Sequence, residues 1–195
     1  MARDLHKMTG ARAEVTIEAS PFWKLGAGRF DLLDVTLFGV DFGGNRIKEV
    51  SLHWEDGGVN VADLAVGVVH ITRIGIMTVR ATLTTQDLTA MIPGTYRPLK
   101  PSLAITPEAL TMGGTVNFDG LNLPVSLSGR LVPSAGGLAI VFRPTRFTVD
   151  GRLLPSPPES TVLTLSSLPL PRSVSLRLTA VHLEHGFVVL DLVGR

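Results

Sequence analysis

The stretch that most constrains this chain runs from Ala109 to Leu154, where apolar and polar residues alternate in four short runs. A period of two residues is typical of a strand that buries one face. Asp119-Gly120 and Asp150-Gly151 supply the positive φ angles that tight turns need. The stretch therefore predicts an antiparallel meander with one apolar and one polar face. That apolar face must be covered by a second sheet, a helix or a ligand.

Alternating segments on both sides extend this β pattern. We expect further strands at 11–18, 29–38, 46–55, 174–182 and 187–193, and a hairpin turn at Asp56-Gly57-Gly58. The long segment Val59–Leu83 is expected to form one bent strand or two, with both faces partly covered. Only Thr84–Ile92 carries clear helix signals, because Thr84 can cap the helix and Asp87 lies near the positive end of its dipole. The sequence thus predicts a mainly β protein with few helices.

The composition fits one folded domain. The chain has 195 residues, of which 45% are hydrophobic, and this argues against disorder. We expect an N-terminal arm or helix remnant at 1–10 and a single β domain at 11–195. The net charge is only +1 and the basic residues are scattered, so no nucleic-acid partner is predicted. The absence of cysteine excludes disulfides and thiolate metal sites.

Signals for catalysis are absent from the sequence. It holds no Gly-x-Ser-x-Gly elbow, no His-Glu-x-x-His motif, no phosphate loop and no glycine fingerprint. His182 and His185 would face opposite sides of a strand, and zinc needs three or four converging ligands. We therefore predict a protein that is not an enzyme and that uses no metal or cofactor.

Several weak motifs follow one another along the chain: Gly28-Arg29-Phe30 before a strand, Thr84–Leu88 (TTQDL) opening a helix, Gly120–Gly129 (GLNLPVSLSG), Val149–Pro155 (VDGRLLP) and Leu168–Pro171 (LPLP). Their order resembles the LmeA-like bacterial phospholipid-binding family. The resemblance covers roughly 11–194. It implies a TULIP-type fold, in which a long, highly curved antiparallel sheet wraps around a helix and leaves an apolar groove for acyl chains. The long N-terminal helix of that fold is missing here or reduced to 1–10, which would leave the groove wider or closed by a second chain.

The resemblance implies phospholipid, or another acyl lipid, as the partner. The expected groove lining is Leu33, Val35, Leu37, Val50, Leu52, Trp54, Ile74, Ile76, Leu110, Met112, Val116, Phe118, Val125, Leu127, Leu138, Ile140 and Phe142. Aliphatic linings suit acyl chains, because about 0.8 kcal/mol is gained per buried methylene. The alternative for the same residues is the dry core of a β-sandwich.

Basic and aromatic residues are candidates for membrane or head-group contact. Phe22, Trp23 and Lys24 could enter a membrane interface, or the two rings could form a packed plug at one end of the sheet. Arg97 and Lys100, like Arg143 and Arg146, could hold a phosphate head group, or could be ordinary solvated charges.

Two hypotheses follow for function. The first is non-enzymatic binding or transfer of phospholipid, in cell-envelope lipid or glycolipid maintenance as the resemblance implies. The second is a structural or interaction β-domain with a dry core that forms a homodimer through an exposed edge. The sequence as written shows no apolar signal segment in 1–10 and no run of 18 apolar residues, which favours the cytoplasm, whereas the resemblance implies the cell envelope.

Overall fold

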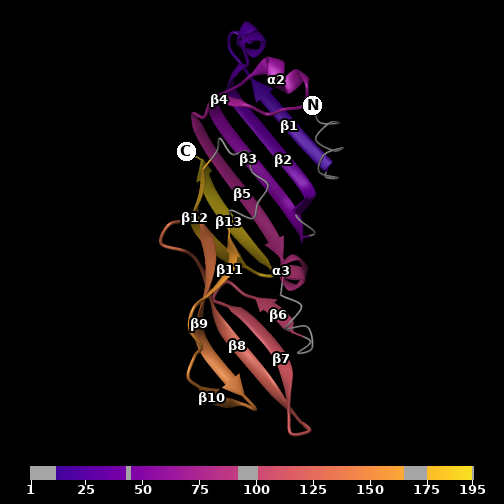
Figure 1. Cartoon of the computed structure of the whole chain (residues 1–195), viewed down its shortest axis with the longest axis vertical. Helices are drawn as coiled ribbons and strands as arrows, with labels where there is room; N and C mark the ends of the chain where they lie inside the picture. Colours follow the sequence, from indigo (N-terminus) through magenta and orange to yellow (C-terminus); the bar gives the residue numbers. More distant parts are fainter. Residues whose placement is uncertain (1–11, 43–44, 92–100, 165–174, 195) are drawn as a thin grey trace.

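A computed structural model of the chain describes residues 12–42, 45–91, 101–164 and 175–194. Within them the protein is mainly β, and its strands form two antiparallel sheets that follow one another along the long axis of an elongated molecule (Figure 1). Neither sheet closes into a barrel. The predicted mainly β class and the antiparallel pairing are therefore confirmed. The predicted N-terminal arm at 1–10 lies outside the described residues.

The upper sheet of Figure 1 is built from both ends of the chain. Its strand order is β1-β2-β3-β5-β13-β12, with β4 paired to β3. The strands are β1 (Arg12–Glu18), β2 (Arg29–Phe42), β3 (Asn45–Val59), β4 (Ile71–Arg73), β5 (Ile76–Thr84), β12 (Leu176–Glu184) and β13 (Phe187–Gly194). The C-terminal hairpin thus returns, after the chain has formed the other sheet, to pair with β5.

The lower sheet contains the predicted meander, with one difference: the last two of the four predicted runs form a single strand, because a register shift lets the chain continue through 143–146 without a turn. Its order is β10-β9-β8-β7-β6, with β11 also paired to β9. The strands are β6 (Ser102–Ile105), β7 (Leu110–Phe118), β8 (Leu121–Pro133), β9 (Ala139–Val149), β10 (Arg152–Leu154) and β11 (Ser160–Thr164). Asp119 and Asp150 have φ angles of 48° at the two turns where the sequence places Asp-Gly pairs.

Backbone hydrogen bonds and a shared core join the two sheets. The Leu178 N–H of β12 donates to the Gly137 carbonyl at 2.8 Å, and the Gly186 N–H donates to the Ile105 carbonyl at 3.1 Å. One hydrophobic cluster contains Leu83 and Val188 of the upper sheet and Leu131 and Phe142 of the lower sheet. The best-buried part of the core therefore lies where the sheets meet.

One predicted turn and the start of one predicted strand are replaced by other structures. The glycine pair Gly57-Gly58 lies inside β3, where a Cβ on Gly57 would stand 2.3 Å from the Phe30 ring. These glycines therefore serve close packing and do not form the predicted hairpin. The start of the predicted strand Val59–Leu83 is the helix α2 (Val61–Ala65), because the Asn60 side chain accepts the N–H groups of Ala62 and Asp63. The 3₁₀ helix η1 (Phe22–Ala27) connects β1 to β2.

The predicted helix is α3 (Thr85–Met91), and it begins with a reciprocal cap. The Thr84 N–H donates to Asp87 Oδ2 at 2.7 Å, and the Asp87 N–H donates to Thr84 Oγ1 at 3.1 Å. Asp87 is 8% exposed, and α3 packs at the junction of the sheets. The pair thus satisfies two backbone N–H donors at the start of the helix that burial would otherwise leave unpaired.

Replacing Asp87 by alanine is expected to lower the free energy of unfolding by about 1 to 2 kcal/mol, because the hydrogen bond from the Thr84 N–H to the buried carboxylate and the favourable charge at the helix N-terminus are both lost. Urea denaturation followed by circular dichroism measures the effect. Gln86→Ala is the matched control, since Gln86 is exposed in the same helical turn. Equal effects of the two substitutions would show that the Asp87 carboxylate contributes nothing to stability.

Candidate functional site

A row of apolar side chains crosses the whole upper sheet on one face. Register places the row in neighbouring positions on the six strands of the main path: Val15, Val35, Leu52, Val79, Leu192 and Leu178. We call this the inner face, and residues two positions away along a strand share it. On β12 a register shift after Leu178 moves the inner position to Val181, which pairs with Leu190. The inner face is apolar on every strand because each of these segments alternates with the same phase relative to its neighbours.

The lower sheet has a corresponding row. Its members are Leu103, Met112, Leu127, Phe147 and Leu154, one from each strand of the main path. Because the hydrophobic cluster includes inner-face residues of both sheets, we treat the two rows as parts of one inner face. This face is the candidate site.

The inner face is covered unevenly. At the junction of the sheets, Leu83 and Val188 are fully buried and Phe142 is 4% exposed. Toward the two ends, Val15, Val35, Leu52, Met112 and Leu127 remain only half-buried. Ile17, at the end of β1, is 41% exposed. The described ends of the inner face are therefore less buried than the junction, and their apolar side chains keep part of their surface exposed.

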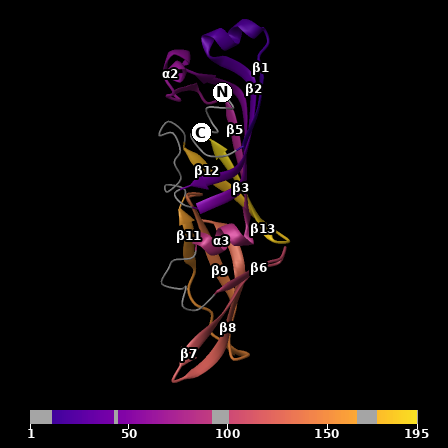
Figure 2. The same ribbon diagram turned by 90° about the vertical axis from the view of Figure 1, so that its right-hand side faces the viewer.

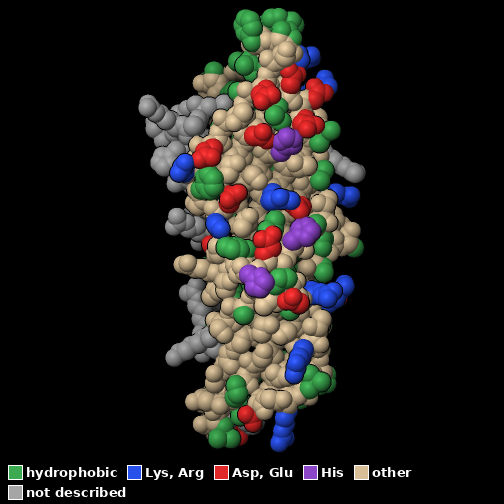
Figure 3. All heavy atoms as spheres, turned by 180° about the vertical axis from the view of Figure 1, so that it is seen from behind, with side chains coloured by type: hydrophobic (Ala, Val, Ile, Leu, Met, Phe, Trp, Pro, Cys, Tyr) green, Lys and Arg blue, Asp and Glu red, His purple; other side chains and the backbone are tan. Residues whose placement is uncertain are grey.

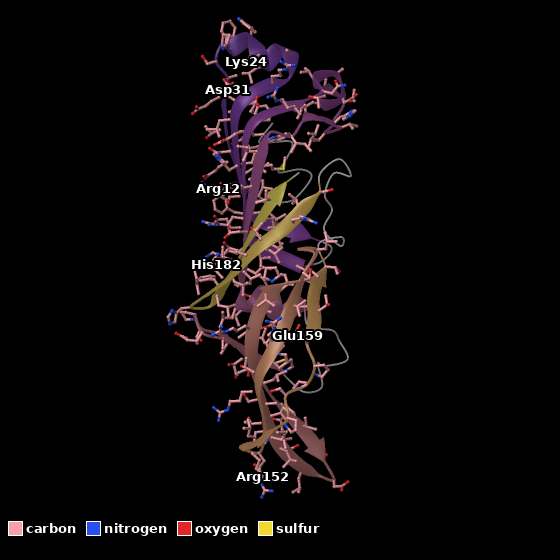
Figure 4. All side chains as sticks on the ribbon, turned by 90° about the vertical axis from the view of Figure 1, so that its left-hand side faces the viewer. Arg12, Lys24, Asp31, Arg152, Glu159 and His182 are labelled. Atoms are coloured by element: carbon pink, nitrogen blue, oxygen red, sulfur yellow. The ribbon has the colours of Figure 1, made fainter. Side chains whose placement is uncertain are left out.

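The opposite, outer face of the upper sheet is polar. Asp34, His53 and Thr78 are register neighbours on it, and charged and histidine side chains are spread over this side in Figure 3. Arg12 and His182 lie along the same side in Figure 4. A shallow depression of about 430 Å³ is lined there by Ser51, His53, Arg80 and Asp191 among others, and an Arg80 Nε–Asp191 Oδ1 contact of 2.8 Å occupies it. Within the described residues, no group of three or more His, Asp or Glu side chains could hold a metal ion.

Most of the predicted groove residues share the inner face. These are Leu33, Val35, Leu37, Val50, Leu52, Trp54, Leu110, Met112, Val116, Val125, Leu127, Ile140 and Phe142. The side chain of Phe118 lies outside the described part of the chain.

Three predicted groove residues lie elsewhere. Ile76 pairs with Glu55 on the outer face and is 60% exposed, because the register of β5 aligns Met77 with Trp54. Leu138 is 60% exposed in the turn before β9. Ile74 precedes β5 and packs against the core, where its carbonyl accepts the indole N–H of Trp54.

Sequence reasoning missed the inner-face residues of β5 and β13. Met77, Val79, Ala81 and Leu83 come from β5, and Val188, Leu190 and Leu192 come from β13. Both phases of the segment before α3 carry apolar residues, so periodicity alone could not choose between them. Gly75, which lies between β4 and β5 with a φ of 57°, was the available sign that the alternation of inner and outer residues shifts by one position before β5.

The predicted cationic contacts are divided among three places. Lys24 Nζ lies 2.6 Å from Asp31 Oδ1 at the end of the upper sheet, beside exposed Phe22 and Trp23 (Figure 4). Arg143 and Arg146 both lie on the outer face of the lower sheet, because a register shift lets them pair with Arg130 and Ser128, which are two positions apart on β8. Arg143 Nε is 2.5 Å from Glu159 Oε1. Arg97 and Lys100 lie outside the described residues.

Lys24 and the backbone also shift the titration of Asp31. The hydrogen bond from Lys24, followed by the one from the Ser20 N–H, lowers the pKa of the Asp31 carboxyl below its ordinary 3.8. Both donors lie between β1 and the end of η1, so this carboxylate fixes that connection to β2. The stabilisation that the ionised Asp31 carboxylate gives to the folded state is present above pH 3.8 and is lost as the pH falls through the lowered pKa.

His53 should titrate above the ordinary histidine value. Its Nδ1 lies 2.6 Å from Asp34 Oδ1 and its Nε2 lies 3.1 Å from Glu55 Oε1, and these carboxylates raise its pKa above 6.5. A raised folded-state pKa means that the stabilising contribution is complete below pH 6.5 and disappears as the pH rises through the folded value. NMR titration of the imidazole measures this pKa, and Asp34→Asn should move it down. A midpoint at or below 6.5 in the unsubstituted protein would contradict the prediction.

Comparison with known proteins identifies one family. The family model described as LmeA-like phospholipid-binding matches residues 6–192, which is nearly the whole chain. No curated protein and no solved structure matches the chain. Among the described residues, no helix is long and apolar enough to cross a membrane.

Proposed function

Because the chain belongs to the LmeA-like phospholipid-binding family, we propose that its inner face holds the acyl chains of a phospholipid and that the protein carries lipid between lipid environments. The role is binding and transfer, and no chemical step is required of the protein. The head group would remain near the rim of the inner face, where solvent can reach it.

One observation carries this proposal: apolar rows cross both sheets, and their ends are only half-buried. Exposed apolar surface of this extent is costly in water, whereas each acyl methylene buried against it contributes about 0.8 kcal/mol. A chain of a dozen or more methylenes would therefore be held firmly without any specific polar contact. The lining is aliphatic on most strands, which suits a flexible acyl chain better than a rigid planar ligand.

The second candidate is a β-domain whose inner face is covered by protein alone. The half-buried ends favour a lipid over a dry core, since a finished protein core would pack at interior density. A second copy of the chain over the inner face would cover the same residues. The two candidates differ in what is released when the folded protein is extracted with organic solvent.

Native mass spectrometry of the purified protein tests the proposal, together with organic extraction and lipid analysis. We expect an added mass equal to one or a few phospholipid molecules, which extraction removes and identifies. Protein that is purified without lipid should load when it is incubated with phospholipid vesicles and re-isolated. Protein that stays lipid-free after both treatments would exclude the carrier role and favour the closed β-domain.

A further inference from the structure

One end of the molecule exposes a cluster of large apolar side chains that the inner face does not include. Phe22 and Trp23 of η1 are 80% and 65% exposed, and Val66 after α2 is 77% exposed. We call this cluster the apolar tip, and its members are Phe22, Trp23, Leu25, Val61, Val66, Val68 and Val69. Both η1 and α2 lie at the upper end in Figures 1 and 2, and hydrophobic side chains gather at that end in Figure 3.

Backbone contacts hold the two segments of the apolar tip together. The Val59 N–H donates to the Gly28 carbonyl at 2.8 Å, and the Asn60 N–H donates to the His70 carbonyl at 2.8 Å. Gly28 ends η1 with a φ of 72°, and a Cβ there would meet the Val59 carbonyl and the Val61 side chain. The apolar tip is therefore preformed, because these contacts fix the backbone that carries its exposed side chains.

Three basic side chains at this end lie beside carboxylates. Residues 65–69 read Ala-Val-Gly-Val-Val and contain no polar side chain. Lys24 pairs with Asp31 at 2.6 Å, His70 Nδ1 lies 3.0 Å from Asp63 Oδ2, and Arg73 pairs with Asp56. An apolar tip whose neighbouring charges are paired with one another suits a partner whose surface has no strong net charge. A tryptophan beside a lysine is also the usual composition of a membrane-interface contact.

We propose that the apolar tip docks the protein on a phospholipid bilayer by inserting the η1 and α2–β4 side chains into the interface. The inference deepens the proposed function and rests on it, because the apolar tip leads directly into the inner face. Exposed Ile17 lies on β1 just before η1, and its register partner on the inner face is Leu33. Docking would thus bring one open end of the inner face to the bilayer from which a lipid enters. Attraction is apolar, so vesicles of phosphatidylcholine should suffice.

The two tryptophans make the docking directly measurable. Trp23 is 65% exposed at the apolar tip, whereas Trp54 is 3% exposed in the core. Phosphatidylcholine vesicles should shift the protein fluorescence to shorter wavelength, and a quencher attached to the lipid chains should reduce it. Trp23→Phe should abolish both responses while leaving the emission of Trp54. Vesicle flotation should show the Phe22→Ser/Trp23→Ser and Val66→Ser/Val68→Ser variants binding at least about tenfold more weakly, since each loses buried apolar area.

The control is Leu138→Ser, which removes a side chain of similar exposure (60%) in the β8–β9 turn and should bind like the unsubstituted protein. Circular dichroism confirms that each variant is folded. Absence of vesicle binding by the folded protein would overturn the proposal, as would binding only to anionic vesicles that salt abolishes. A concentration-dependent dimer that the tip variants lose, without vesicle binding, would instead assign the tip to a second copy and also overturn it.

The docking and the carrier role can fail separately. Lipid supplied from detergent micelles should load the folded tip variants to the normal extent, because their inner face is unchanged. Normal lipid loading by an unsubstituted protein that does not bind vesicles would remove the docking proposal and leave the carrier role. Vesicle binding by a protein that never retains lipid would remove the carrier role and leave the docking proposal.

Discussion

Replacing Leu127 by glutamate should lower the amount of bound phospholipid by about tenfold or more, because a carboxylate would have to be buried against an acyl chain. Leu127 lies in the row of the lower sheet between Met112 and Phe147 and is half-buried. It therefore faces the proposed occupant without belonging to the fully buried junction of the sheets. Lipid extraction and quantification per mole of folded protein measures the effect.

Ser126→Glu is the matched control, since Ser126 lies on the outer face of the same strand and pairs with Gly113 and Thr148. It should leave the bound lipid unchanged. A second pair in the upper sheet, Val35→Glu with Thr36→Glu as its control, keeps the test valid if Leu127→Glu does not fold. Normal lipid content in folded proteins carrying both inner-face substitutions would contradict the proposed site.

Replacing Trp54 by alanine should lower the free energy of unfolding by about 3 to 5 kcal/mol, as expected for truncating a buried aromatic side chain. Trp54 is 3% exposed, and its ring meets Phe30 edge-to-face with centroids 4.9 Å apart. Its indole N–H donates to the Ile74 carbonyl. The substitution removes the aromatic contact, leaves a cavity, and unpairs a carbonyl that ties the segment before β5 to β3.

Trp23→Ala is the control, because Trp23 is 65% exposed and its loss should change stability by no more than about 0.5 kcal/mol. Urea denaturation followed by far-ultraviolet circular dichroism compares the two without depending on tryptophan emission. Similar midpoints for the two variants would mean that the Phe30–Trp54 contact does not anchor the upper sheet.

The lower sheet was largely predictable from sequence because its constraints are local. Strict alternation fixes which side chains share a face, and Asp-Gly pairs fix where β7 turns to β8 and β9 to β10. The cap of α3 was equally predictable from sequence, since Thr84 and Asp87 are three residues apart. The order of weak motifs also indicated the family to which the chain belongs.

The glycines show where local signals have two possible meanings. Gly57-Gly58 is compatible with a hairpin and with close packing, and only the position of Phe30 across from Gly57 decides between them. In the same way, Asn60 changes a predicted strand start into α2 by accepting two backbone N–H groups. Such choices depend on which residues, distant in the chain, pack beside or hydrogen-bond to the position, and a short window of sequence does not contain that information.

The sequence by itself thus determined that the chain is mainly β, which face is apolar in the strands that alternate strictly, and the family. Only the tertiary structure decided which strands adjoin, and hence that Val15 of β1 and Leu178 of β12 stand in one apolar row although most of the chain separates them. It likewise placed Ile76 on the outer face and brought η1 beside α2 at the apolar tip. The physical reason is that alternation is set by the backbone of one strand, whereas register and neighbourhood are set by hydrogen bonds between segments far apart in the chain.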